Sequence, residues 1–179
     1  MKNCIMALLW VALGAASVHC SCAALAHELR FYLPAAKLPP ESPTERLRLS
    51  TGQEVAVATP PIARVGRESV VGARGVLIPV AVEPGAERWL GEPKVYRVVF
   101  KLTQHAQRAL QEGIDRYCGT GTDVQIAVAN TIVDHVVLLG CGGVFEAGAS
   151  FVDEQAAQKF AQEFAGKSVN FSSATPSPR

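Results

Sequence analysis

Apolar and polar side chains alternate over residues 95–102 (VYRVVFKL), and this period of two predicts a β-strand with one buried face. Thr103 follows directly and is a good helix N-cap. Behind it an apolar stripe recurs at helical spacing, formed by Ala106, Leu110, Ile114 and Tyr117. Gly119 then ends the helical pattern. The segment therefore predicts a strand followed by an amphipathic helix.

A second strand is predicted where Val124, Ile126 and Val128 share one face. The turn predicted at residues 129–130 makes the next apolar run, residues 132–139, an antiparallel partner. Glycines then interrupt the chain before a possible short strand at residues 144–147. Asp153 caps a second predicted helix. The apolar stripe of that helix consists of Ala157, Phe160, Ala161 and Phe164.

The predicted element order is β-α-β-β-(β)-α, which indicates the α+β class. We expect one small sheet with two helices packed on one face. Residues 61–167 form this domain, and prolines make residues 27–60 a partly irregular extension laid on or beside it. Residues 168–179 are rich in serine and proline, and we expect a disordered tail.

The first 26 residues have the layout of a secretory signal peptide: an early Lys2, an uncharged apolar run over residues 4–18 and small residues at 24–26. We predict cleavage after Ala26 and a periplasmic or secreted mature protein. The run is shorter than the ~20 residues that span a bilayer, which argues against a membrane anchor. A lipid-anchored form through Cys20 or Cys22 is a weaker alternative, because neither cysteine has the preceding residues of a lipoprotein signal.

The overall charge is balanced, with 17 basic and 16 acidic side chains. Cleavage would remove Lys2 and leave equal numbers. A nucleic-acid-binding domain normally carries a basic face, so this balance argues against nucleic acid and against anionic lipid as partners. The length of 179 residues corresponds to one ordinary domain.

Two of the five cysteines, Cys118 and Cys141, would remain after cleavage. In an oxidising compartment they are candidates for a disulfide. The predicted topology supports the bond, because it brings both residues to the same end of the sheet. The alternative is two buried thiols that do not meet.

Candidate chemistry is sparse. Asp134 and His135 are neighbours on a predicted strand, where adjacent side chains point to opposite faces, so they do not form a relay. His105 falls in the first turn of a predicted helix and is expected in solvent. His27 would be the new N-terminus, and an amine with an imidazole can bind copper, but fraying of the terminus argues against such a site. We therefore predict no catalytic, cofactor-binding or metal-binding residues.

The second half resembles the head subdomain of the first periplasmic domain of SecD, a subunit of the SecDF protein-export accessory complex. The resemblance covers residues 61–167 and lies in VVFKLTQHAQRAL, VQIAVANTIVDHVVL and GGVFEAGASFVDEQAAQKFAQEFAGK. In the last block the matching positions are Phe145, Gly148, Phe151 and Ala156. The chain departs from the family at Ala129-Asn130, His135 and Val152, where Asp-Gly, proline and threonine are usual.

The resemblance implies the fold and, at most, contact with polypeptide outside the cytoplasm. We therefore expect a stand-alone, non-enzymatic module that binds protein or peptide, with a sheet edge as one way to do so. One alternative is a structural, self-assembling protein of the cell envelope. Another is an enzyme whose site no motif reveals. The oligomeric state stays open.

Overall fold

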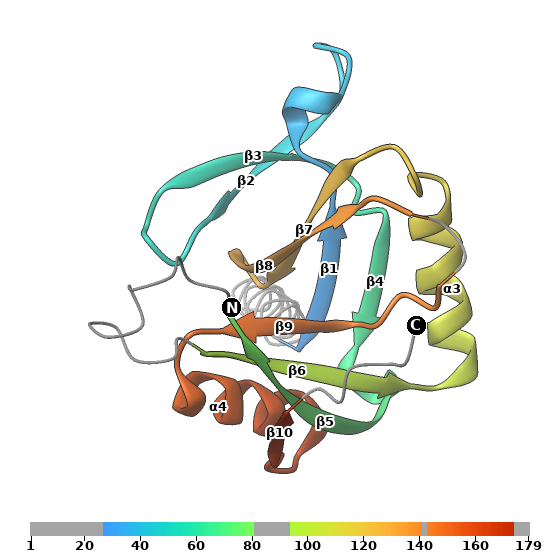
Figure 1. The fold of residues 1–179 in the computed structure, drawn as a ribbon. Coiled ribbons are helices and arrows are strands. Elements are labelled where there is room, and N and C mark those ends of the chain that lie inside the picture. Colours follow the sequence, from blue (N-terminus) through green and yellow to red (C-terminus); the bar gives the residue numbers. More distant parts are fainter. Residues whose placement is uncertain (1–26, 81–93, 141–142, 174–179) are drawn as a thin grey trace, which may run out of the picture.

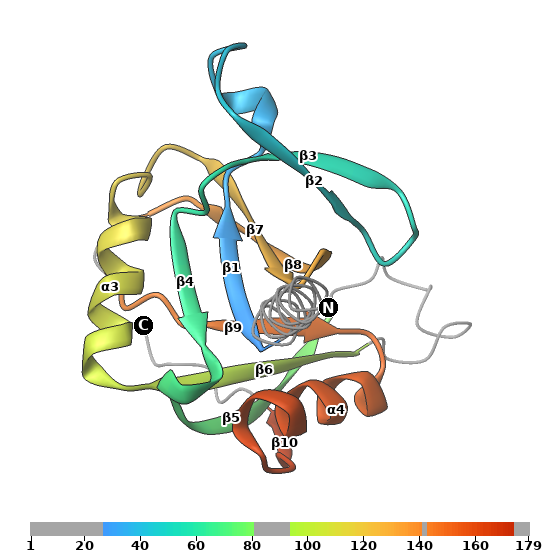
Figure 2. The same ribbon diagram turned by 180° about the vertical axis from the view of Figure 1, so that it is seen from behind.

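A computed structural model describes residues 27–80, 94–140 and 143–173, and in this part of the chain the strands form two sheets. Figures 1 and 2 show that the strands of the two sheets run across one another, with β1 and β4 crossing the direction of β6 and β9. One helix lies beside each sheet. The two short 3-10 turns are η1 (Ala35–Lys37) and η2 (Arg67–Ser69).

The larger sheet has six strands in the order β3-β2-β8-β7-β1-β4. They are β1 (Glu28–Tyr32), β2 (Thr44–Arg48), β3 (Glu54–Ala58), β4 (Ala63–Gly66), β7 (Thr122–Val128) and β8 (Thr131–Leu138). The sheet bends back on itself: β2 meets β8 at the single pair Arg48↔Thr131, and the Ala58 amide donates to the Leu33 carbonyl just after β1. The β2–β3 hairpin therefore covers the second face of β1.

The smaller sheet has four strands in the order β10-β5-β6-β9. They are β5 (Val70–Pro79), β6 (Lys94–Leu102), β9 (Gly148–Phe151) and β10 (Phe171–Ser173). β6 is antiparallel to both β5 and β9, whereas β10 runs parallel to β5. The alternation that predicts β6 thus belongs to a strand paired on both sides.

Side-chain caps define both helices. In α3 (Gln104–Asp115) the Thr103 hydroxyl accepts a hydrogen bond from the Ala106 amide. In α4 (Glu154–Ala165) the Asp153 carboxylate accepts from the amides of Gln155 and Ala156. Gly166 ends α4 with a φ of 65°, a left-handed conformation that glycine adopts without a Cβ penalty. Both predicted N-caps are confirmed.

One hydrophobic core joins both sheets and both helices. Leu29 and Phe31 enter it from β1, Phe100 from β6, and Leu110 from α3. The Phe100 ring lies 5.4 Å from Phe160 and 5.6 Å from Phe164, measured between ring centroids, which docks α4 on the smaller sheet. Neither sheet buries its apolar face alone, so the two fold as one unit.

The α+β class and the order β6-α3-β7-β8-β9-α4 are confirmed, but the short strand expected at residues 144–147 lies at Gly148–Phe151 (β9). The strands are divided between two sheets, where the sequence led us to expect one: β6 and β9 pair in the smaller sheet, and β7 and β8 in the larger. Alternation reveals which face of a strand is buried but not which strand lies beside it, because the hydrogen-bonding partner is backbone.

Residues 27–60 are built into the larger sheet and do not form a separate layer. β1 lies between β7 and β4, and Leu29, Phe31 and Tyr32 are fully buried. β1 pairs with β7, and β2 meets β8, two strands that lie far along the chain. The prolines of residues 27–60 gave no sign of these distant pairings.

The predicted disordered tail is wrong for residues 168–173. Val169 is buried in the core, and the Gln158 side chain hydrogen-bonds both its amide and its carbonyl. Phe171 then opens β10, and its ring lies 5.1 Å from Tyr96 between centroids. A Cβ on Gly75 would stand 2.7 Å from the Phe171 ring, so the glycine makes room for it. Residues 174–179 lie outside the described part.

Gly148 is where the smaller sheet tolerates no side chain, because a Cβ there would collide with the Val98 carbonyl oxygen. Gly148→Ala is expected to lower the free energy of unfolding by about 1–3 kcal/mol, since the clash is with backbone. Gly72→Ala is the matched control, because the nearest atom to its Cβ is 3.9 Å away. Urea unfolding of both variants tests this, and equal stabilities would contradict the tight β6–β9 contact.

Candidate binding groove

A hollow of about 880 Å³ lies between helix α3 and the segment that leads into β9. A second hollow of about 520 Å³ adjoins it and shares Lys101, Leu102, Gln107 and Val144. We call the two together the α3 groove. Pockets of roughly 300–1,000 Å³ are the usual size of ligand sites. Most of the surface inside both hollows is apolar.

The end of the pairing between β6 and β9 creates the groove. The two strands pair up to Val99↔Gly148, and one further bond joins the Phe100 amide to the Ala147 carbonyl at 2.8 Å. Beyond it the chain before β9 turns away toward α3. Lys101 and Leu102 keep β5 as a neighbour on one side, and on the other side they line the groove. The last part of β6 thus presents a strand edge to the hollow.

Two glutamines of α3 hold the far wall. The Gln111 side chain accepts from the Phe145 amide at 2.8 Å and donates to the Gly143 carbonyl at 3.3 Å. The Gln107 amide donates to the Phe145 carbonyl at 2.9 Å. The Phe145 ring packs edge-on to Phe31 of the core, 5.9 Å between centroids. Hydrogen bonds from helix side chains therefore hold the segment before β9 in place, as a neighbouring strand would. The end of β6 across the groove has no strand paired to it on this side.

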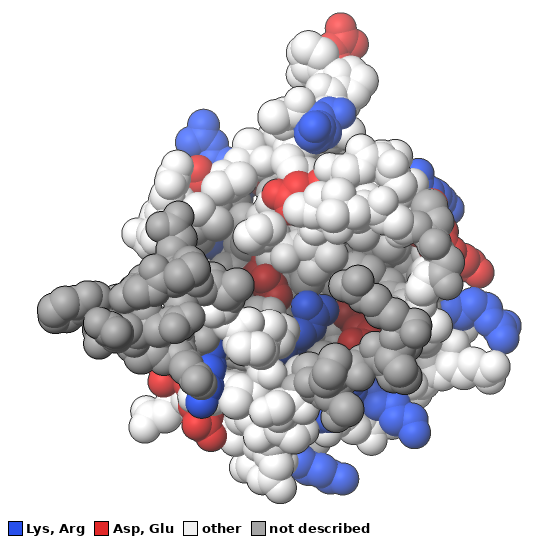
Figure 3. Space-filling view, viewed as in Figure 1, with Lys and Arg blue, Asp and Glu red and all other residues white. Residues whose placement is uncertain are grey.

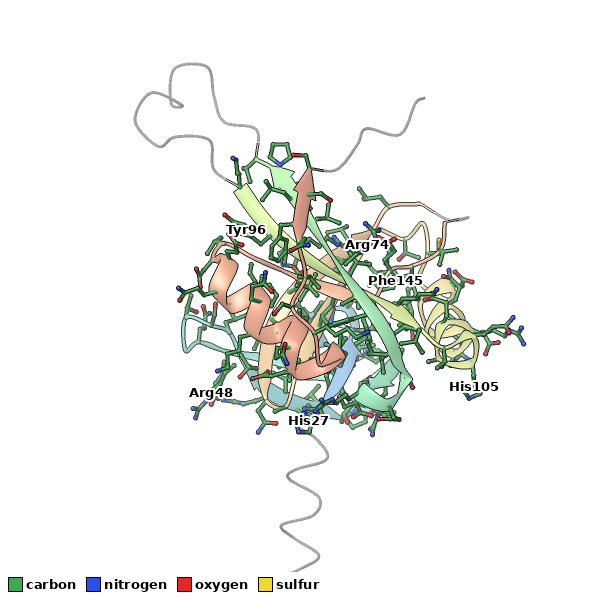
Figure 4. The ribbon with its side chains drawn as sticks, turned by 90° about the horizontal axis from the view of Figure 1, so that it is seen from below. His27, Arg48, Arg74, Tyr96, His105 and Phe145 are labelled. Carbon is green, nitrogen blue, oxygen red and sulfur yellow. The ribbon has the colours of Figure 1, made fainter. Side chains whose placement is uncertain are left out.

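An apolar side chain projects into the groove: Val144 lines both hollows and is 73% exposed. An exposed apolar side chain at a hollow is typical of a binding surface. Figure 4 shows Phe145 and Arg74 on the same side of the molecule, toward α3. The groove therefore combines apolar contact surface with an accessible strand edge.

The charged side chains of the groove include both signs. Arg74 and Glu146 form an ion pair of 2.6 Å across the smaller hollow. Asp115, near the end of α3, accepts from the Gln111 amide at 2.6 Å. Lys101 and Arg108 lie at the other end of the larger hollow. Figure 3 shows both signs spread over this face of the molecule.

The structure separates the residues that carried candidate chemistry. Asp134 accepts from the His135 backbone amide and from the Ser150 amide of β9, each at 2.8 Å. An irregularity in the β7–β8 pairing, between Ile126 and Ala127, lies beside it, and Asp134 links the two sheets. His135 is exposed. His27 and His105 are exposed and lie far apart (Figure 4).

Within residues 27–80, 94–140 and 143–173, no cluster of three or more His, Cys, Asp or Glu side chains is placed to hold a metal ion. In the same ranges no helix is both long and apolar enough to cross a bilayer.

The sequence reasoning missed Gln107 and Gln111. A signal was present, because Gln104, Gln107 and Gln111 follow one another at helical spacing beside the apolar stripe of α3. A row of amides next to a core-facing stripe indicates side chains that hydrogen-bond a neighbouring backbone.

A second polar cluster lies on the face of β1 turned away from the main core. Arg30 is 6% exposed, its Nε and Nη2 atoms are buried without a hydrogen-bond partner, and its guanidinium stands 5.6 Å from the Tyr32 ring centroid. Burial, followed by the nearby Glu45, raises the pKa of the Tyr32 hydroxyl above its ordinary range. A buried charge with open donors costs stability.

Cys118 lies just beyond the end of α3, and its Sγ atom is 2.8 Å from the Gly140 carbonyl oxygen. Gly140 directly precedes Cys141, which lies outside the described residues. Cys118 is thus close to the residue that directly precedes Cys141. The bond itself stays a prediction.

The fold and the groove define a small α+β module in which the end of β6 pairs with β5 but not with β9. No family model matches the chain, and no curated protein matches its sequence. Among solved structures it is similar to one titled "Crystal structure of SecDF in Super-membrane-facing form", with 12% identity and a TM-score of 0.48. The match covers 83% of this chain and 20% of that one, so this chain spans about a fifth of its length.

The buried guanidinium makes a testable prediction about stability. Arg30→Met keeps the volume and removes the unpaired charge, so we expect the free energy of unfolding to rise by about 1–3 kcal/mol. Arg64→Met, at the exposed partner position on β4, is the control and should change it by no more than about 0.5 kcal/mol. A large loss of stability in Arg30→Met alone would show that the guanidinium is paired in solution.

The disulfide is tested on protein produced in an oxidising compartment and purified without reductant. We expect non-reducing peptide mapping to recover one linked pair, Cys118 with Cys141. Reduction should then lower the free energy of unfolding by about 3 kcal/mol, the chain-entropy value for a loop of roughly two dozen residues. Alkylation of both cysteines without prior reduction would contradict the bond, and Cys118→Ser supplies the reference for the unlinked protein.

Proposed function

We propose that this protein is an exported, non-enzymatic module that binds an extended polypeptide segment in the α3 groove. The open edge of β6, bordered by apolar surface, is the observation that carries the proposal. In β-strand addition, main-chain hydrogen bonds to a free edge provide affinity, and pockets for alternate side chains provide specificity. This groove offers both elements side by side.

The geometry favours an extended ligand over a helical one. Lys101 and Leu102 continue a strand, and the wall opposite them is held by Gln107 and Gln111 at a distance from that strand. A peptide segment bound between the strand and this wall lies alongside the end of β6. It takes the side on which β9 pairs with the earlier part of the same strand. Val144 and Leu102 then receive its apolar side chains.

We further propose that binding takes place outside the cytoplasm, in the periplasm or after secretion. The support is the signal-peptide layout of residues 1–26, with cleavage after Ala26. Extended segments with apolar side chains are abundant there, because chains arrive unfolded. The proposal agrees with the contact with polypeptide that the SecD resemblance implies.

Fluorescence anisotropy with labelled peptides of alternating valine and threonine tests the proposal on the chain from His27 onward. Val144→Asp places a charge on the rim of the groove. It should weaken binding roughly tenfold, since it removes the valine contact that the bound peptide would bury. Val152→Asp is the matched control: Val152 is 86% exposed and does not line either hollow. Its affinity should stay within about twofold of the parent protein.

Two results would overturn the proposal. One is the absence of measurable binding by any extended apolar peptide. The other is equal weakening by Val144→Asp and Val152→Asp, which would place the binding surface elsewhere. Circular dichroism of both variants verifies that each remains folded.

A further inference from the structure

The charges that line the α3 groove differ in whether they are already engaged. Both carboxylates have partners: Glu146 pairs with Arg74 at 2.6 Å, and Asp115 accepts from Gln111 at 2.6 Å. The cations Lys101 and Arg108 make no ion pair with the described acidic residues. The first turn of α3, beside these two cations, contains no acidic residue. One end of the groove is therefore positive and open.

We propose that the groove selects extended apolar segments that carry a carboxylate at the end lying against Lys101 and Arg108. This inference rests on the proposed function and names the ligand class of the same site. A carboxylate there meets two basic side chains that nothing within the described chain neutralises. The ligand's apolar residues then lie along Leu102 and Val144.

The groove also has a direction. Arg108 and Asp115 are seven residues apart on α3, which corresponds to about 10 Å along the helix axis. A carboxylate next to Asp115 would face a like charge, whereas one next to Arg108 faces an opposite charge. The groove should therefore distinguish a peptide with its acidic end at one terminus from the reversed sequence.

The experiment measures binding of four peptides with the same valine–threonine core. One carries two aspartates at its N-terminal end, one carries them at its C-terminal end, one has two lysines in their place, and one is uncharged. Each is made with an amidated and a free C-terminus, which separates a side-chain carboxylate from a terminal one. The better acidic peptide should bind roughly three- to tenfold more tightly than the lysine peptide at low salt, as expected for two exposed ion pairs.

Charge reversal supplies the decisive variant. Lys101→Glu combined with Arg108→Glu should invert the preference, so that the lysine peptide binds more tightly. Lys159→Glu makes the same change on the exposed surface of α4, outside the groove, and should leave the order unchanged. Added salt should narrow the difference between acidic and lysine peptides in the parent protein.

The outcomes separate this inference from the proposed function. If the uncharged peptide binds and Val144→Asp weakens it, but all charged peptides bind alike, charge selection is wrong and the groove function stands. If the preference survives the double reversal, the carboxylate binds elsewhere and the inference falls. If no peptide binds, both proposals fall together.

Discussion

The close pairing of β6 with β9 is the contact on which the rest of the structure depends. Gly148 lets the backbones of β6 and β9 approach closely at Val98. The smaller sheet then packs against α4 through Phe100. The pairing then ends after Phe100, where Ala147 accepts its last backbone hydrogen bond. The paired part of the two strands covers the hydrophobic core, and the α3 groove lies where the strands separate.

Stability and accessibility are thus provided by different parts of one strand. The central part of β6 has strands on both sides, whereas Lys101 and Leu102 at its end have only β5. An exposed strand edge is normally an aggregation risk that proteins cover or shorten. Here the edge is short, and Gln107 and Gln111 hold the opposite wall without occupying it. The arrangement suits reversible contact with an extended chain.

Two polar side chains connect separate secondary-structure elements. Asp134 ties β8 to β9, and Gln158 ties α4 to the segment before β10. Each satisfies backbone groups that would otherwise be buried or frayed. Arg30 is an exception, since two of its buried nitrogen atoms have no partner among the described residues. The inside of the curled larger sheet is therefore the less well stabilised part of the core.

The sequence by itself determined the local elements from β6 to α4 other than the position of β9, together with their order and the helix caps, because side-chain period and capping chemistry act over a few residues. Tertiary structure alone decided the division into two sheets, the burial of β1 and the docking of residues 168–173. The groove also belongs to that second group. It arises where β6, α3 and residues 143–147 meet, and such meetings depend on backbone pairing and packing between segments that no local pattern connects.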